Sequence, residues 1–176
     1  VNAQHEKDYL FYLNHGFHVG PSAGQDNHLP NWGASSAARV GVWLEHLTKA
    51  ELLEALRQRR CFATEDENLE LKVTANGSWV GNTVSVSPGH SLQIKVTVAD
   101  TDEPNATYTV NLYYDPAIGD QQEARVVGTR KSVRDHQEVT FQHKPTTGSY
   151  CFVKVTQASS KHTWRDDAWS SPVWVK

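Results

Sequence analysis

Residues 92–98 read LQIKVTV, with an apolar side chain at every second position. Side chains of a β-strand alternate between its two faces, so this stretch can bury one face and expose the other. Four more stretches alternate in the same way, at residues 69–73, 108–114, 139–141 and 150–155. Turn-forming clusters rich in Gly, Pro, Asn and Ser separate them. We therefore expect residues 67–176 to form an immunoglobulin-like β-sandwich domain of seven or eight strands.

Residues 1–66 have a different pattern, which predicts a separate segment of mixed helix and strand. Tyr9, Leu10 and Leu13 recur at helical spacing, and the run ends at Gly16, where glycine can adopt the positive φ of a helix terminus. The stretch from residue 17 to 43 is rich in Gly, Pro, Ser and Asn and predicts a long loop with strand fragments. Long ordered loops often carry function.

A second helix is predicted at residues 49–60. Thr48 and Glu51 have the spacing of a capping box ahead of an apolar run. Three arginines, Arg57, Arg59 and Arg60, then fall in the expected last turn, where the helix dipole favours cations.

Composition excludes several classes of protein. The 17 basic and 20 acidic residues give a net charge of −3, which offers no field for binding nucleic acid through bulk charge. The mean hydropathy is −0.58, and no apolar run approaches the about 18 residues of a membrane span, so we expect a soluble chain without a membrane partner. Cys61 and Cys151 lack metal-ligand spacing and are expected to be two buried thiols, although pairing stays open. Periplasmic and secreted locations are both compatible with this composition.

The candidate chemistry lies in the first segment, at Asp26-Asn27-His28. In an extended segment a carboxylate and an imidazole two residues apart point to the same face, which suits joint binding of a metal ion. The alternative is an Asx-type turn ahead of Pro30. A catalytic zinc site normally takes three protein ligands plus water, so two ligands do not complete one.

An ordered string of residues resembles the end of a PHP (polymerase and histidinol phosphatase) domain metallohydrolase, in the branch whose catalytic domain is followed by a β-sandwich. The string comprises Phe17–Gly20, Gly24–His28, Asn31–Gly33, Ala38–Val42, Leu47–Thr48, Ala55–Leu56 and Arg59–Thr64, together with Asn76-Gly77, Gly81 and Ala168–Val175. The resemblance implies that residues 1–66 are the C-terminal segment of a distorted PHP-type barrel and that residues 67–176 are the sandwich.

The resemblance also implies a function and a set of site residues. Asp26 and His28 would bind a cluster of divalent metals (Mn, Zn or Fe), and metal-activated water would attack a small phosphoester substrate. Arg39, Arg60 and His18 would contact the substrate, the arginines through bidentate bonds to phosphate. Each has a plainer alternative, which is a salt bridge for Arg39, a helix-capping cation for Arg60 and an ordinary hydrogen bond for His18.

One departure from the family pattern limits this expectation. The family begins with an H-x-H motif and carries further ligands along its barrel, but this chain contains no H-x-H. We therefore expect a longer parent protein to be a metal-dependent phosphoesterase, and residues 1–176 alone to be inactive and to hold no metal tightly. The cut would expose an apolar face of residues 1–66, which could pack on the sandwich or promote self-association.

The rival hypothesis is a module that binds carbohydrate or protein without catalysis. Aromatic side chains could stack on sugar rings if they form an exposed flat row, and the candidates are Trp79, Tyr113, Tyr114, Trp164 and Trp169. Aromatic residues in a sandwich more often fill the core or its rim.

Overall fold

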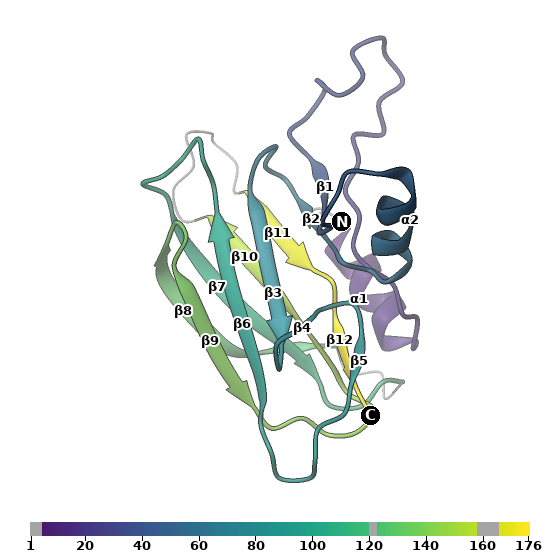
Figure 1. Cartoon of the computed structure of the whole chain (residues 1–176), viewed down its shortest axis with the longest axis vertical. Helices are drawn as coiled ribbons and strands as arrows, with labels where there is room; N and C mark the ends of the chain where they lie inside the picture. Colours follow the sequence, from purple (N-terminus) through teal and green to yellow (C-terminus); the bar gives the residue numbers. More distant parts are fainter. Residues whose placement is uncertain (1–4, 120–122, 158–165) are drawn as a thin grey trace.

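The computed structural model describes residues 5–119, 123–157 and 166–176. Across these residues the strands form two sheets that pack face to face, one of eight strands and one of four (Figure 1). The predicted mainly-β sandwich is therefore confirmed. The four-stranded sheet has the order β4 (Ser78–Trp79), β3 (Glu70–Ala75), β6 (Leu92–Ala99) and β9 (Glu138–His143), with antiparallel neighbours throughout.

The eight-stranded sheet is built around β10 (Tyr150–Gln157). On one side β10 pairs with β7 (Thr107–Asp115), which pairs with the edge strand β8 (Arg125–Arg134). Its other side pairs with β12 (Val173–Val175) at its start and with β11 (Asp167–Ser170) near its end. β11 continues to β2 (Cys61–Thr64) and the edge strand β1 (Arg39–Val42), while β12 pairs in parallel with β5 (Thr83–Val84).

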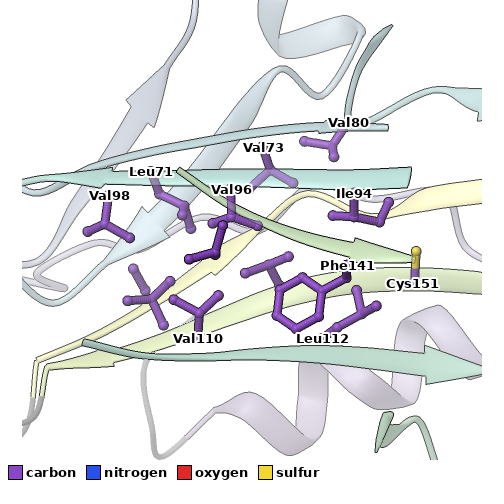
Figure 2. Packing of buried hydrophobic residues seen from close by; sticks show 14 of the residues in the cluster. Leu71, Val73, Val80, Ile94, Val96, Val98, Val110, Leu112, Phe141 and Cys151 are labelled. Carbon is purple, nitrogen blue, oxygen red and sulfur yellow. The ribbon is translucent and has the colours of Figure 1, made fainter. Parts of the chain in front are cut away.

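The core between the sheets follows from the alternation in β6. Leu92, Ile94, Val96 and Val98 are all at most 1 % exposed and meet the apolar rows of the neighbouring strands and of the facing sheet. Figure 2 shows this layer, with side chains from β3, β6, β7, β9 and β10 pointing toward one another. Cys151 lies in it, and both Cys151 and Cys61 are buried free thiols, as the sequence suggested.

The outer face of the eight-stranded sheet is covered by α1 (Glu6–Asn14), the first predicted helix (Figure 1). Tyr9, Leu10 and Leu13 pack in one buried cluster with aromatic residues of β10, β11 and β12, which are Tyr150, Phe152, Trp169 and Trp174. β10 is therefore buried on both faces. Of the outcomes left open for residues 1–66, the structure shows packing of this helix on the sandwich.

An ion cluster fastens the same helix to the sheet. Lys154 of β10 donates a hydrogen bond to Glu6 of α1, and its Nζ lies 3.0 Å from Asp167 Oδ2 of β11. All three side chains are less than one-fifth exposed. Burial alone would lower the pKa of Lys154, but the hydrogen bond to Glu6 and the attraction of Asp167 raise it above its ordinary value.

The second helix, α2, spans Lys49–Arg57, so the prediction that Arg59 and Arg60 lie in its last turn is wrong. Half of the predicted capping box is present, because the Thr48 side chain accepts from the backbone N–H of Glu51 at 3.2 Å, while the Glu51 carboxylate accepts from the backbone N–H of His46 and not from that of Thr48. The helix ends early because Arg59 adopts a φ of 54°, and the N–H groups of Arg59 and Arg60 donate to the carbonyls of Leu56 and Ala55. This is the Schellman pattern, with arginine where glycine is usual.

Residues 1–66 also extend the sandwich itself. β2 pairs with β11, so Phe62, Ala63 and Thr64 lie opposite Ser170, Trp169 and Ala168. The expected boundary after residue 66 falls in the loop between β2 and β3, and strands from both sides of it share one sheet. No helix in the described part of the chain is long and apolar enough to cross a membrane.

Candidate metal half-site and its surroundings

The loop between α1 and β1 carries Asp26 and His28 and extends beyond the end of the sheets (Figure 1). Within it, Asp26 Oδ1 lies 3.2 Å from His28 Nε2, and the two side chains are 96 % and 86 % exposed. Asp26 has a φ of 44°, a left-handed conformation that turns the chain at this point. The predicted pair does come together and faces solvent, but through a turn at Asp26 and not along the extended segment that was expected.

The side-chain amides of Gln25 and Asn27 hold the loop in this shape. Gln25 donates to the Ser36 carbonyl at 2.6 Å, and its Oε1 accepts from Gly33 N at 3.1 Å and Ser35 Oγ at 2.8 Å. Asn27 forms the Asx turn that was the alternative reading, since its Oδ1 accepts from Leu29 N at 2.9 Å. The Asx turn and the Asp26–His28 pair are both present, because the turn uses only the Asn27 side chain and the flanking Asp26 and His28 side chains can contact each other.

Arg39 serves as the clamp at the base of this loop. Its guanidinium donates to the carbonyls of Ser36 and Ala38, both at 2.9 Å, and of Gly33 at 3.1 Å. It also lies 3.6 Å from Glu67 Oε2. The plainer alternative for Arg39, an ion pair, is thus present, and its donors are engaged within the chain.

The other two predicted substrate contacts lie in different surroundings. Arg60 donates to Gln58 Oε1 through both Nε and Nη2, just after α2. His18 stacks on Trp174 with ring centroids 4.1 Å apart and planes 8° from parallel. Burial lowers the pKa of His18, and the Arg59 guanidinium, 5.5 Å from the Trp174 ring centroid, lowers it further. No described contact joins Arg60 or His18 to Asp26 or His28.

Within the described residues, Asp26 and His28 form one of several exposed pairs of a histidine and a carboxylate, beside His5–Asp8 and His46–Glu51. In the described residues, no group of three or more His, Cys, Asp and Glu side chains is arranged to hold an ion. Carboxylate oxygen and imidazole nitrogen suit Zn, Mn or Fe, so the donor chemistry fits the expected metals while the number of ligands does not complete a site.

A hollow beside the loop was not anticipated from the sequence. It has a volume of about 970 Å³, and its lining includes Arg39, residues 33–38 and six acidic residues, namely Glu65, Asp66, Glu67, Asp102, Glu103 and Asp166. These residues come from four separate parts of the chain, so no local motif marks them. The excess of negative charge favours cations over phosphate here.

The aromatic residues proposed for sugar binding do not form a flat exposed row among the described residues. Trp169 and Tyr114 are buried, Tyr113 stacks on Phe152 with centroids 4.9 Å apart, and Trp79 stacks on Trp43. Trp164 lies outside the described residues.

Comparison with protein-family models gives no match to this chain, and comparison with curated proteins likewise gives none. The resemblance to PHP-domain hydrolases therefore stays a prediction from the residues themselves.

Proposed function

We propose that this chain is the C-terminal part of a PHP-type metal-dependent hydrolase, in which Asp26 and His28 form one limb of a divalent-metal site and an immunoglobulin-like sandwich supports it. The observation that carries the proposal is the 3.2 Å approach of Asp26 Oδ1 to His28 Nε2 on an exposed, internally bonded loop. Both side chains are largely exposed, and a shared ion requires accessible donor atoms.

The surrounding residues explain how such a limb is held in place. Arg39 ties the loop to the start of β1 through the carbonyls of Gly33 and Ser36. β1 is in turn paired with β2, a strand of the sandwich sheet. A loop positioned by a rigid scaffold is a common arrangement for binding groups.

The number of ligands defines what the chain does alone. A bound divalent ion would activate water toward a phosphoester and neutralise charge on the phosphoryl oxygens. Because residues 1–176 supply two ligands of the three or more required, we expect the chain by itself to bind metal weakly and to show no turnover. The remaining barrel strands and ligands would come from a longer parent protein.

The test is calorimetric titration of residues 1–176 with Mn²⁺ or Zn²⁺, alongside Asp26→Ala and His28→Ala. We expect weak binding that both substitutions abolish. His46→Ala is the matched control, because His46 Nδ1 also lies close to an exposed carboxylate, 3.1 Å from Glu51 Oε1.

Two outcomes would contradict the proposal. If His46→Ala weakens metal binding as much as His28→Ala does, the ion is held by any exposed histidine and carboxylate. If purified residues 1–176 hydrolyse p-nitrophenyl phosphate in a metal-dependent way that survives Asp26→Ala, the assignment of the site is wrong.

A further inference from the structure

One edge of the eight-stranded sheet is open. The backbone N–H of Trp43 donates to the Arg60 carbonyl at 2.9 Å, continuing the register in which Gly41 faces Phe62 and Arg39 faces Thr64. In an antiparallel pair every second residue bonds toward its partner, so the N–H and C=O groups of Val40 and Val42 point away from β2. Within the described residues no backbone hydrogen bond satisfies them.

A groove of about 470 Å³ runs along this strand. Its floor includes Trp43 and the Phe62 ring, which lies over Gly41 because glycine has no side chain to obstruct it. The opposite wall is the segment Glu67–Glu70 at the start of β3, and Trp43 Nε1 fixes its distance by donating to the Leu71 carbonyl at 2.9 Å. The groove therefore combines an apolar floor with one row of unpaired backbone groups.

The charges around the groove favour a positively charged ligand. Glu67 and Glu70 lie on its wall, while the single cation, Arg39, is engaged by three carbonyls and by Glu67. Beyond Arg39 the groove continues into the carboxylate-lined hollow, which shares Arg39, Glu67 and Asn68 with it. A cationic side chain would be attracted along the whole path.

We propose that this groove binds an extended peptide segment of another protein by adding it as a strand to β1, with alternating apolar residues on the floor and Lys or Arg toward Glu67 and Glu70. Main-chain hydrogen bonds supply affinity in this mode of recognition, and the side-chain positions supply selectivity. The volume suits a few residues of single chain rather than a second copy of the protein, which would bring its own β2 and α2 along with the pairing strand.

The probe is the peptide acetyl-Val-Lys-Val-Thr-Val-Lys-Val-amide, titrated against ¹⁵N-labelled residues 1–176. We expect the largest chemical-shift changes at the amides of Val40 and Val42. Two N-methylated versions, blocked at the odd or at the even positions, separate strand addition from other binding. One version should lose about tenfold or more in affinity and the other should bind like the parent peptide, because only one set of N–H groups faces β1.

Matched changes on both partners complete the test. Replacing the two lysines of the peptide by glutamate should weaken binding about tenfold. On the protein, Val42→Pro removes an outward N–H that the β1–β2 pair does not use, whereas Val42→Thr keeps it, so the first should abolish binding and the second should preserve it.

The proposal fails if both N-methylated peptides bind equally well, or if the glutamate peptide binds as tightly as the lysine peptide. It also fails if sedimentation shows that residues 1–176 form a dimer that Val42→Pro dissociates, since the strand edge is then occupied by a second copy. The peptide results use the native chain, so they hold even if Val42→Pro does not fold.

Discussion

Two edge strands of the eight-stranded sheet, β1 and β8, each place a glycine under a phenylalanine ring, and the third edge strand is the two-residue β5. On β1, Gly41 lies under the ring of Phe62 from the neighbouring strand, and a Cβ at Gly41 would overlap that ring. On β8, Gly128 lies under Phe141 from the facing sheet, and a Cβ there would come within 2.8 Å of Phe141 Cδ1. At each edge, the glycine has no side chain, and the phenylalanine ring fills that space at the end of the core.

The edges differ in what protects them. β8 carries four cations, Arg125, Arg130, Lys131 and Arg134, and two irregularities in its pairing with β7. The Arg130 guanidinium lies 4.6 Å from the Phe141 ring centroid and donates to the Thr140 carbonyl at 2.9 Å. Charges and bulges prevent unwanted pairing at sheet edges. β1 has only Arg39, which turns back to its own loop, so β8 is protected by charges and bulges while β1 is not.

The largest effects should come from the two rings. Phe62→Ala and Phe141→Ala each remove a phenyl group that is at least 95 % buried, and we expect a loss of about 3–5 kcal/mol in the free energy of unfolding for either. Urea denaturation followed by tryptophan fluorescence measures both. A loss below about 1 kcal/mol for Phe62→Ala would show that the β1 end lies outside the cooperative core.

Adding a methyl group beneath each ring should destabilise the β1 edge more than the β8 edge. Gly41→Ala should cost about 1–3 kcal/mol, because its Cβ would overlap the Phe62 ring. Gly128→Ala should cost less, since its Cβ would come within 2.8 Å of the edge of the Phe141 ring, whereas the Cβ at Gly41 would overlap the Phe62 ring more deeply. The check is a double mutant. In the Phe62→Ala background, Gly41→Ala should reduce the free energy of unfolding only slightly. An undiminished loss would show that the added methyl group clashes with something other than the Phe62 ring.

The sequence predicted the parts of the fold that depend on local pattern. The alternation of Leu92 to Val98 required one buried face, and the structure confirms β6 with that face in the core. β8 escaped detection because its bulges break the period of two and its long side chains face solvent at an edge. β11 was also missed, because the four residues Asp167–Ser170 are all buried and therefore show no alternation.

The candidate site shows the same division. The sequence predicted that Asp26 and His28 share one face of an extended segment, but the structure brings them within 3.2 Å through a turn at Asp26, whose φ is 44°. The groove and the carboxylate-lined hollow depend on the meeting of β1, the loop after β2 and the loop after β6, which only tertiary structure determines. The extent of α2 was overestimated because nothing in the sequence marks Arg59, rather than a glycine, as the residue with positive φ.

A smaller effect should follow from removing the cation that closes β8. Arg130→Ala eliminates the contact with the Phe141 ring and the bond to the Thr140 carbonyl, and we expect a loss of about 1 kcal/mol. Arg130→Lys should recover only part of it, because lysine cannot lie flat on the ring while donating from a rigid fork. Thermal denaturation of the three proteins measures these losses. Equal stability of Arg130→Ala and the parent protein would show that the contact of Arg130 with the Phe141 ring does not stabilise the β8 edge.

The smallest expected effect is a dependence on pH at the β9 strand beside β8. Burial lowers the pKa of His143, whose ring lies 4.1 Å from that of Tyr114 and whose Nε2 is buried without a partner in the described structure. Because the unfolded chain then binds the proton more tightly, stability is full above the ordinary pKa of about 6.5 and falls as the pH drops below it, levelling off beneath the folded-state pKa. Urea midpoints at pH 7.5 and pH 5.5 should differ in this direction, and His143→Gln should reduce the difference. His18→Gln is the comparison from the N-terminal segment, because burial and the Arg59 guanidinium also lower the pKa of His18, which stacks on Trp174 of β12. An unchanged midpoint difference in His143→Gln would contradict the contribution of His143, and a reduced difference in His18→Gln would then assign the acid sensitivity to the N-terminal segment.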